Sequence, residues 1–325
     1  MTLFWVGFFV FILAMLTLDL FVFNRKSHVV GVKEAVKFSI FWIALAVAFN
    51  VLVWYTMGTQ KAVEFTTGYI LELTLSVDNL FVFILVFGYF CTPKYCLHKV
   101  LFWGIIGALV FRGLFIFVGV ALIEQFEWII YLFGVFLVIT AVKMAFSQDR
   151  KIDPKKNLAV LGFRKVFPVT DDYHGDRFWT RTAVGALVAT PLLVTLVFVE
   201  STDIVFAMDS IPAILAITTD PFVVYTSNAF AILGLRSLFF ALSSAITAFC
   251  YLKYGLSVIL AFVGLKMLLA KFVHVPTELS LLVIAVVLGI TIAASLIKNR
   301  GRDTCPVPGE DTKQKRDEDG EGHTP

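Results

Sequence analysis

The apolar residues of this chain fall into long stretches that no soluble fold requires. A helix needs about 20 mostly apolar residues to cross the hydrocarbon core of a bilayer. Nine stretches reach that length, at about residues 3–23, 38–56, 66–90, 99–122, 128–146, 183–218, 223–247, 254–272 and 278–297. The pattern therefore predicts an all-α polytopic membrane protein with about nine transmembrane helices.

The sixth stretch, 183–218, is too long for one straight spanning helix. It contains Pro191 and Pro212, and a proline inside a helix removes a backbone hydrogen bond. We therefore expect a kinked or broken helix here. A division of this stretch into two full spans would give ten spans instead of nine.

Basic residues in the connecting segments distinguish between nine and ten spans. Lysine and arginine follow spans one, three, five, seven and nine, and they are scarce in the other connections. Because such residues accumulate in cytoplasmic loops, every odd-numbered span is expected to end in the cytoplasm. Nine spans satisfy this rule throughout, with the N-terminus outside and the C-terminus in the cytoplasm. Ten spans would place the basic flank of the last span outside.

Composition supports the membrane class. Apolar residues make up 59% of the 325 residues and charged residues 16%, whereas a soluble domain has about 45–50% and about 25%. The net charge is only +3, and we expect no nucleic-acid partner. Residues 1–297 form one predicted transmembrane domain with a cytoplasmic loop at 147–182. The tail at 298–325 is polar and without apolar periodicity, so it is predicted to be disordered in the cytoplasm.

All four cysteines map to the predicted cytoplasmic side. We expect reduced thiols at Cys91, Cys96, Cys250 and Cys305 for that reason. Cys91, Cys96 and His98 together suggest a metal loop as an alternative. Their spacing fits no usual zinc pattern, so the plain reduced loop is favoured.

Two parts of the chain share the order and spacing of their polar residues. Glu72-Leu-Thr-Leu-Ser-Val-Asp78-Asn79 aligns with Asp203-Ile-Val-Phe-Ala-Met-Asp209-Ser210, and an arginine on the next span follows each, Arg112 and Arg236. We predict two three-helix repeats, 66–146 and 183–272. Because three is odd, the second repeat runs opposite to the first. Secondary transporters use this arrangement and bind their substrates near the bilayer midplane.

Carboxylates within these spans predict a metal site. There are five of them, Glu72, Asp78, Glu200, Asp203 and Asp209. Each carboxylate costs about 2.5–3.5 kcal/mol at the bilayer centre, so five are too many to be incidental. The candidate ligands are Glu72, Asp78, Asn79, Glu200, Asp203, Asp209 and Ser210. Oxygen ligands suit Mn²⁺, Mg²⁺ or Ca²⁺ better than Zn²⁺ or Cu⁺, and the choice among the first three stays open.

A static network of buried charges is the alternative interpretation. Arg112 and Arg236 lie in the middle of their spans and are candidate counter-charges for the acids. Five acids against two arginines leave three negative charges in excess, which a metal ion, protons or both must balance. The partner of Glu72 is also open, because the repeat alignment favours Asp203 and residue type favours Glu200.

These motifs resemble the TerC family of integral membrane proteins, and most of all its bacterial Alx-type branch. The resemblance rests on the two acidic segments and on Ile211-Pro212, Thr219-Asp220-Pro221-Phe222 and Asn228-Ala-Phe-Ala-Ile-Leu-Gly234-Leu-Arg236. It covers about residues 1–297 and implies a multi-pass bacterial inner-membrane protein linked to manganese export and, in some members, to tellurium oxyanion resistance. It also implies that the seven candidate ligands correspond to the family's acidic motif residues.

The favoured hypothesis is a manganese exporter that works by alternating access, with a counter-transported proton as a plausible coupling. The partners are then the lipid bilayer and a divalent cation, with no prosthetic group and no enzymatic activity. A non-transporting membrane scaffold associated with tellurite resistance is the alternative. An intramembrane aspartyl protease is disfavoured, because Asp78 and Asp209 lack the Gly-x-Gly-Asp context of such enzymes. The oligomeric state is left open.

Overall fold

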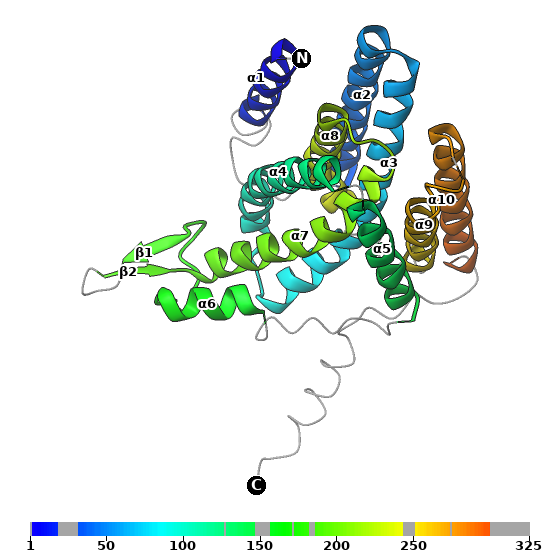
Figure 1. Cartoon of the computed structure of the whole chain (residues 1–325). Coiled ribbons are helices and arrows are strands. Elements are labelled where there is room, and N and C mark those ends of the chain that lie inside the picture. Colours follow the sequence, from blue (N-terminus) through cyan, green and yellow to red (C-terminus); the bar gives the residue numbers. More distant parts are fainter. Residues whose placement is uncertain are drawn as a thin grey trace.

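The computed structural model describes residues 2–18, 32–126, 128–146, 157–170, 172–181, 186–242, 251–273 and 275–299. These residues form ten helices and one two-stranded sheet (Figure 1). The elements are α1 (Thr2–Leu18), α2 (Val32–Met57), α3 (Thr59–Tyr89), α4 (Lys94–Gln125), α5 (Ile129–Phe146), α6 (Leu158–Val166), β1 (Trp179–Arg181), β2 (Leu187–Ala189), α7 (Pro191–Leu215), α8 (Pro221–Leu242), α9 (Leu252–Leu268) and α10 (Thr277–Asn299).

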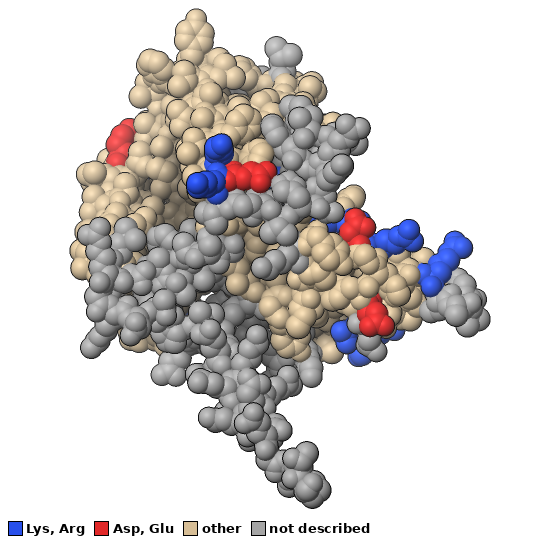
Figure 2. Space-filling view, turned by 180° about the vertical axis from the view of Figure 1, so that it is seen from behind, with Lys and Arg blue, Asp and Glu red and all other residues tan. Residues whose placement is uncertain are grey.

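Each predicted span corresponds to one apolar helix. Seven of these helices, α2, α3, α4, α5, α7, α8 and α10, are long and apolar enough to cross a membrane, whereas α1 and α9 are shorter. On the face that Figure 2 draws, charged side chains stand in only a few places among the described residues, as a lipid-facing surface requires. The all-α polytopic fold is confirmed, and the count of nine spans stays a prediction.

The sixth predicted span is wrong at residues 186–190, which are not helical. Leu187–Ala189 forms β2, which pairs with the antiparallel strand β1, and α7 begins only at Pro191. Proline suits the first helical turn because its missing N–H would have no partner there. Pro212 lies within α7, which continues to Leu215. The helix is therefore single, so of the two expected forms, kinked or broken, the broken one is wrong.

The predicted loop at 147–182 contains structure that the hydropathy pattern did not indicate. The Asn157 side chain caps α6 by accepting hydrogen bonds from the backbone N–H groups of Ala159 and Val160 at 2.9 and 3.1 Å. Farther along, the Tyr173 hydroxyl donates to the Phe90 carbonyl at 2.8 Å. Burial raises the pKa of Tyr173 above its ordinary value, so the neutral hydroxyl is favoured. The segment is thereby attached to the turn between α3 and α4.

The cysteines of this turn are free. Cys91 is exposed, and the buried Cys96 thiol donates to the Gly175 carbonyl at 3.4 Å. The other two cysteines, Cys250 and Cys305, lie outside the described residues. So does the tail from residue 300 onward, whereas α10 extends to Asn299.

The two predicted repeats pack on each other in a reciprocal way. Helix α3 of the first contacts α8 of the second, α7 of the second contacts α4 of the first, and α5 lies against α9 (Figure 1). If α3, α4 and α5 correspond to α7, α8 and α9 through a twofold relation, a contact of α3 with α8 requires a matching contact of α7 with α4. The opposite orientation of the two units stays a prediction.

Helix α8 lies at the centre of this arrangement. It contacts α2, α3 and α4, and the polar side chains of Thr226, Ser227 and Asn228 are all buried within it. Aromatic rings pack between α8 and α2, where Phe230 contacts Phe49 with ring centroids 4.8 Å apart. The polar residues of α8 are therefore enclosed by protein, which places them in reach of the acids on α3 and α7.

Candidate intramembrane site

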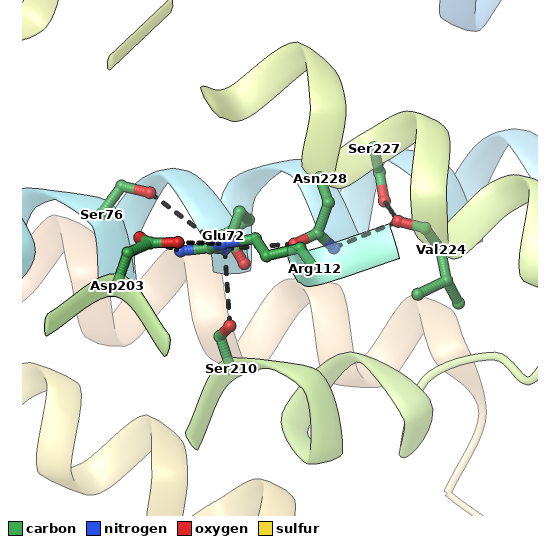
Figure 3. Close-up of polar contacts among 8 residues, drawn as sticks. All are labelled: Glu72, Ser76, Arg112, Asp203, Ser210, Val224, Ser227 and Asn228. Carbon is green, nitrogen blue, oxygen red and sulfur yellow. Dashed lines mark hydrogen bonds and ion pairs between the residues drawn. The ribbon is translucent and has the colours of Figure 1, made fainter. Parts of the chain in front are cut away.

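The guanidinium of Arg112 on α4 is the centre of the site, with 1% of the side chain exposed. Its Nη1 atom donates to Oε1 of Glu72 on α3. Its Nη2 and Nε atoms donate to the two carboxylate oxygens of Asp203 on α7, at 3.1 and 3.3 Å (Figure 3). Paired contacts of this kind are strong and directional. One arginine thus joins a carboxylate from each predicted repeat.

Neutral oxygens complete the surroundings of this arginine. Its Nη1 atom donates to Oδ1 of Asn228 on α8 at 3.2 Å and lies 3.5 Å from the Ser210 hydroxyl on α7. The Asn228 Nδ2 atom donates to the Val224 carbonyl at 3.1 Å, which orients the amide oxygen toward the guanidinium. Four helices therefore contribute to one buried polar centre.

One oxygen of this centre lacks a partner. The Oε2 atom of Glu72 is buried and accepts no hydrogen bond among the described residues, whereas Oε1 accepts from Arg112 and from the Ser76 hydroxyl at 3.3 Å. Most buried polar atoms in folded proteins are hydrogen-bonded. Glu72 and Asp203 also carry two negative charges against the single positive charge of Arg112. Two carboxylates therefore share one arginine in this centre, and one of their oxygens has no donor among the described residues.

A second polar group lies next to the first. Asn79 of α3 and Asp209 and Ser210 of α7 line a cavity of about 20 Å³, room for about one water molecule. Thr140 of α5 donates to Oδ1 of Asp209 at 3.2 Å. Ser210 lines this cavity and also contacts Arg112, so the two polar groups are adjacent.

Glu200 occupies a separate position one helical turn before Asp203. Its carboxylate lies against Gly107 on α4, where any Cβ atom would overlap it. Its Oε2 atom is buried and has no hydrogen-bond partner among the described residues. Of the two candidate partners of Glu72, it is Asp203 that shares an arginine with it.

The remaining predicted residues take different positions. Arg236 of α8 is buried and lines a small cavity that it shares with Asp203 and with Gly104 of α4. Asp78 lies on α3, but its side chain is outside the part of the chain that the structure describes.

The predicted ligands are not assembled around one point. Among the residues whose side chains are described, no three of His, Cys, Asp and Glu lie together as a metal site would require. They are divided among the Arg112 centre, the Asp209 cavity and the Glu200 position. Sequence reasoning missed Asn228 and Thr140, which bond to this site. The available signal was that both are polar residues inside otherwise apolar spans.

Comparison with known proteins assigns the family. Residues 57–303 match the model of the integral membrane protein TerC family, a segment that contains every residue of the site. The chain belongs to the TerC family. No solved structure matches it.

Relatives within the TerC family are similar over nearly their whole length. A protein of Myxococcus xanthus named "Uncharacterized membrane protein STKORF319" is 50% identical over 300 residues, which cover 92% of this chain and 94% of that protein. A Salmonella typhi protein, provisionally named a membrane-bound redox modulator, Alx, is 44% identical over 308 residues, 92% of this chain and 95% of its own. The protein of the same name in Escherichia coli K12 is 43% identical over 302 residues, 90% and 93% of the two chains.

Proposed function

We propose that this protein exports divalent manganese across the bacterial inner membrane by alternating access. The observation that supports the proposal most strongly is the meeting of Glu72 and Asp203 at one buried centre. These carboxylates come from different three-helix units. Relative motion of the two units would therefore change the site itself, which is what alternating access needs.

The donor chemistry favours a hard cation. The Arg112 centre and the adjoining cavity offer carboxylate, amide and hydroxyl oxygens, from residues such as Asp209, Asn228 and Ser210. Such oxygens suit Mn²⁺, Mg²⁺ and Ca²⁺. In the inward-facing state the acids would load the cation, and in the outward-facing state they would release it. Protons that replace the cation on the same acids would couple the two half-cycles.

A non-transporting membrane scaffold is the second candidate. Two observations favour it: Arg112 already holds Glu72 and Asp203 in a bonded network, and relatives carry the provisional name of a redox modulator rather than of a transporter. Such a protein would assist other envelope proteins or stress resistance without moving ions itself.

Flux through the purified protein separates the two candidates. Inside-out vesicles that contain the wild type should accumulate Mn²⁺, and Asp209→Asn should abolish that uptake while the protein stays folded. Asp172→Asn makes the same chemical change at an exposed loop residue and serves as the matched control. If the wild type moves none of Mn²⁺, Mg²⁺ and Ca²⁺, the exporter is excluded and the scaffold is supported.

A further inference from the structure

We propose that Arg112 is a built-in competitor for the transported cation. Its guanidinium occupies the Glu72–Asp203 carboxylate pair while the site is empty, and it moves to Glu200 when a divalent cation takes that pair. This inference rests on the proposed function and adds to it the step by which the protein exchanges its own positive charge for the cargo.

The geometry places the guanidinium where a cation would bind. Arg112 contacts both carboxylates, the Asn228 amide oxygen and the Ser210 hydroxyl, and these come from three helices around α4. Two carboxylates with two neutral oxygens form a ligand set for a hard divalent ion. The same atoms therefore serve either a guanidinium or a metal ion.

The guanidinium and a divalent cation compete for the same oxygens of the Glu72–Asp203 pair. Glu72 and Asp203 carry two negative charges, and Arg112 supplies only one positive charge. A divalent cation alone would neutralise the pair, whereas the cation and Arg112 together would set three positive charges against two negative ones. Like charges in a buried site oppose each other strongly. The unpartnered Oε2 atom of Glu72 is the independent sign that the pair is not satisfied by the arginine.

Glu200 is suited to receive the displaced guanidinium. It lies one turn before Asp203 on α7 and faces α4 at Gly107, and its buried Oε2 atom has no hydrogen-bond partner among the described residues. Side chains on a helix point toward its N-terminus, which is the direction from Arg112 to Gly107. Arg112 already contacts Asp203, and Glu200 lies about one helical turn from Asp203 on α7, so the guanidinium would move by about that distance along α7 to reach the Glu200 carboxylate.

Equilibrium binding of Mn²⁺ tests the competition. The full-length protein in lipid nanodiscs is titrated with Mn²⁺, and the free ion is counted by its electron paramagnetic resonance signal. Arg112→Gln should bind Mn²⁺ at least about tenfold more tightly than the wild type, because the competing charge is gone. Arg112→Lys should bind more tightly by a smaller factor, since lysine keeps the charge without the paired contacts. Lys266→Gln, which removes a lysine bonded to Ser280 on another helix, should leave binding unchanged.

The same binding comparison can overturn the inference. A static structural role for Arg112 predicts that Arg112→Gln and Arg112→Lys bind Mn²⁺ no tighter than the wild type. If Arg112→Gln does not fold, the sign of the change in Arg112→Lys decides the matter. A wild type that moves no cation in vesicles contradicts the proposed function, whereas the binding comparison decides the competition independently of flux.

Glu200→Gln tests the second half of the inference. As an acceptor for Arg112, Glu200 matters only while the arginine is present. The substitution should therefore weaken Mn²⁺ binding in the wild-type background and leave it unchanged in the Arg112→Gln background. An equal loss in both backgrounds would make Glu200 a metal ligand and refute its role as the acceptor.

Discussion

At the scale of single residues, the Thr140 hydroxyl orients Asp209 in its cavity. It donates to Oδ1 of Asp209 at 3.2 Å from a different helix, and valine would keep its shape without the donor. A hydrogen bond to a charged group contributes about 1.5–3 kcal/mol. If that bond also orients Asp209 in the loaded state, Thr140→Val should reduce Mn²⁺ uptake at limiting concentration by roughly tenfold, since 1.4 kcal/mol is about tenfold.

Thr74→Val is the control for this prediction. The Thr74 hydroxyl donates to the Ile70 carbonyl of its own helix at 2.6 Å and forms no hydrogen bond with a predicted ligand whose side chain is described. Uptake should change little in this variant. Equal uptake by Thr140→Val and the wild type would show that Asp209 does not depend on Thr140.

The acids could be found from sequence, but their grouping could not. A carboxylate in an apolar span is rare enough to be recognised by itself. Helix periodicity places Glu72 and Asn79 on one face of α3, and the structure nevertheless divides them between two groups. Seven residues along a helix is about 10 Å, so residues on one face lie at different depths. Only the packing of α4 and α7 against α3 decides which of these residues lies at the depth of Arg112.

At the scale of helices, the contact between α5 and α9 depends on two glycines. A Cβ atom at Gly264 would lie 2.9 Å from the Gly134 carbonyl oxygen, and backbone cannot move aside as a flexible side chain can. Small residues let membrane helices approach closely in this way. Gly264→Ala should therefore lower the free energy of unfolding by about 1–3 kcal/mol, the usual cost of overpacking.

Thermal unfolding in nanodiscs measures this cost. Gly289→Ala on α10 is the matched control, because no atom lies within 4 Å of the Cβ it would add. Its midpoint should equal or exceed that of the wild type, since alanine favours helix over glycine. If the thermal unfolding midpoint of Gly264→Ala is as high as that of Gly289→Ala, α5 and α9 do not pack this closely.

Hydropathy predicted where the helices lie, because burial in lipid demands long apolar runs. It misassigned residues 186–190, where the apolar Leu187–Ala189 pairs as a strand with Trp179–Arg181. Pairing of this kind depends on contacts between distant residues, which a local apolar run does not reveal. Pro191 could have indicated where the helix begins, since proline is favoured in the first turn of a helix.

At the scale of the whole molecule, reciprocal packing has a mechanical consequence. Because α3 packs on α8 and α7 packs on α4, the two predicted repeats contact each other through both of these helix pairs. The Arg112 centre lies where the two units interlock. Under the proposed competition, a change of occupant at this centre would alter the contact between the two predicted repeats.

Direction of transport depends on orientation, and the exposed thiol of Cys91 can report it. With the N-terminus outside, the turn between α3 and α4 faces the cytoplasm. A variant that keeps Cys91 as its only cysteine should react with a membrane-impermeant maleimide in inside-out vesicles and not in intact cells. Tyr55→Cys in a cysteine-free background places a thiol at a position 86% exposed near the end of α2, and it should react in intact cells only. The reverse labelling of both variants would invert the topology, and the same carboxylate site would then serve uptake rather than export.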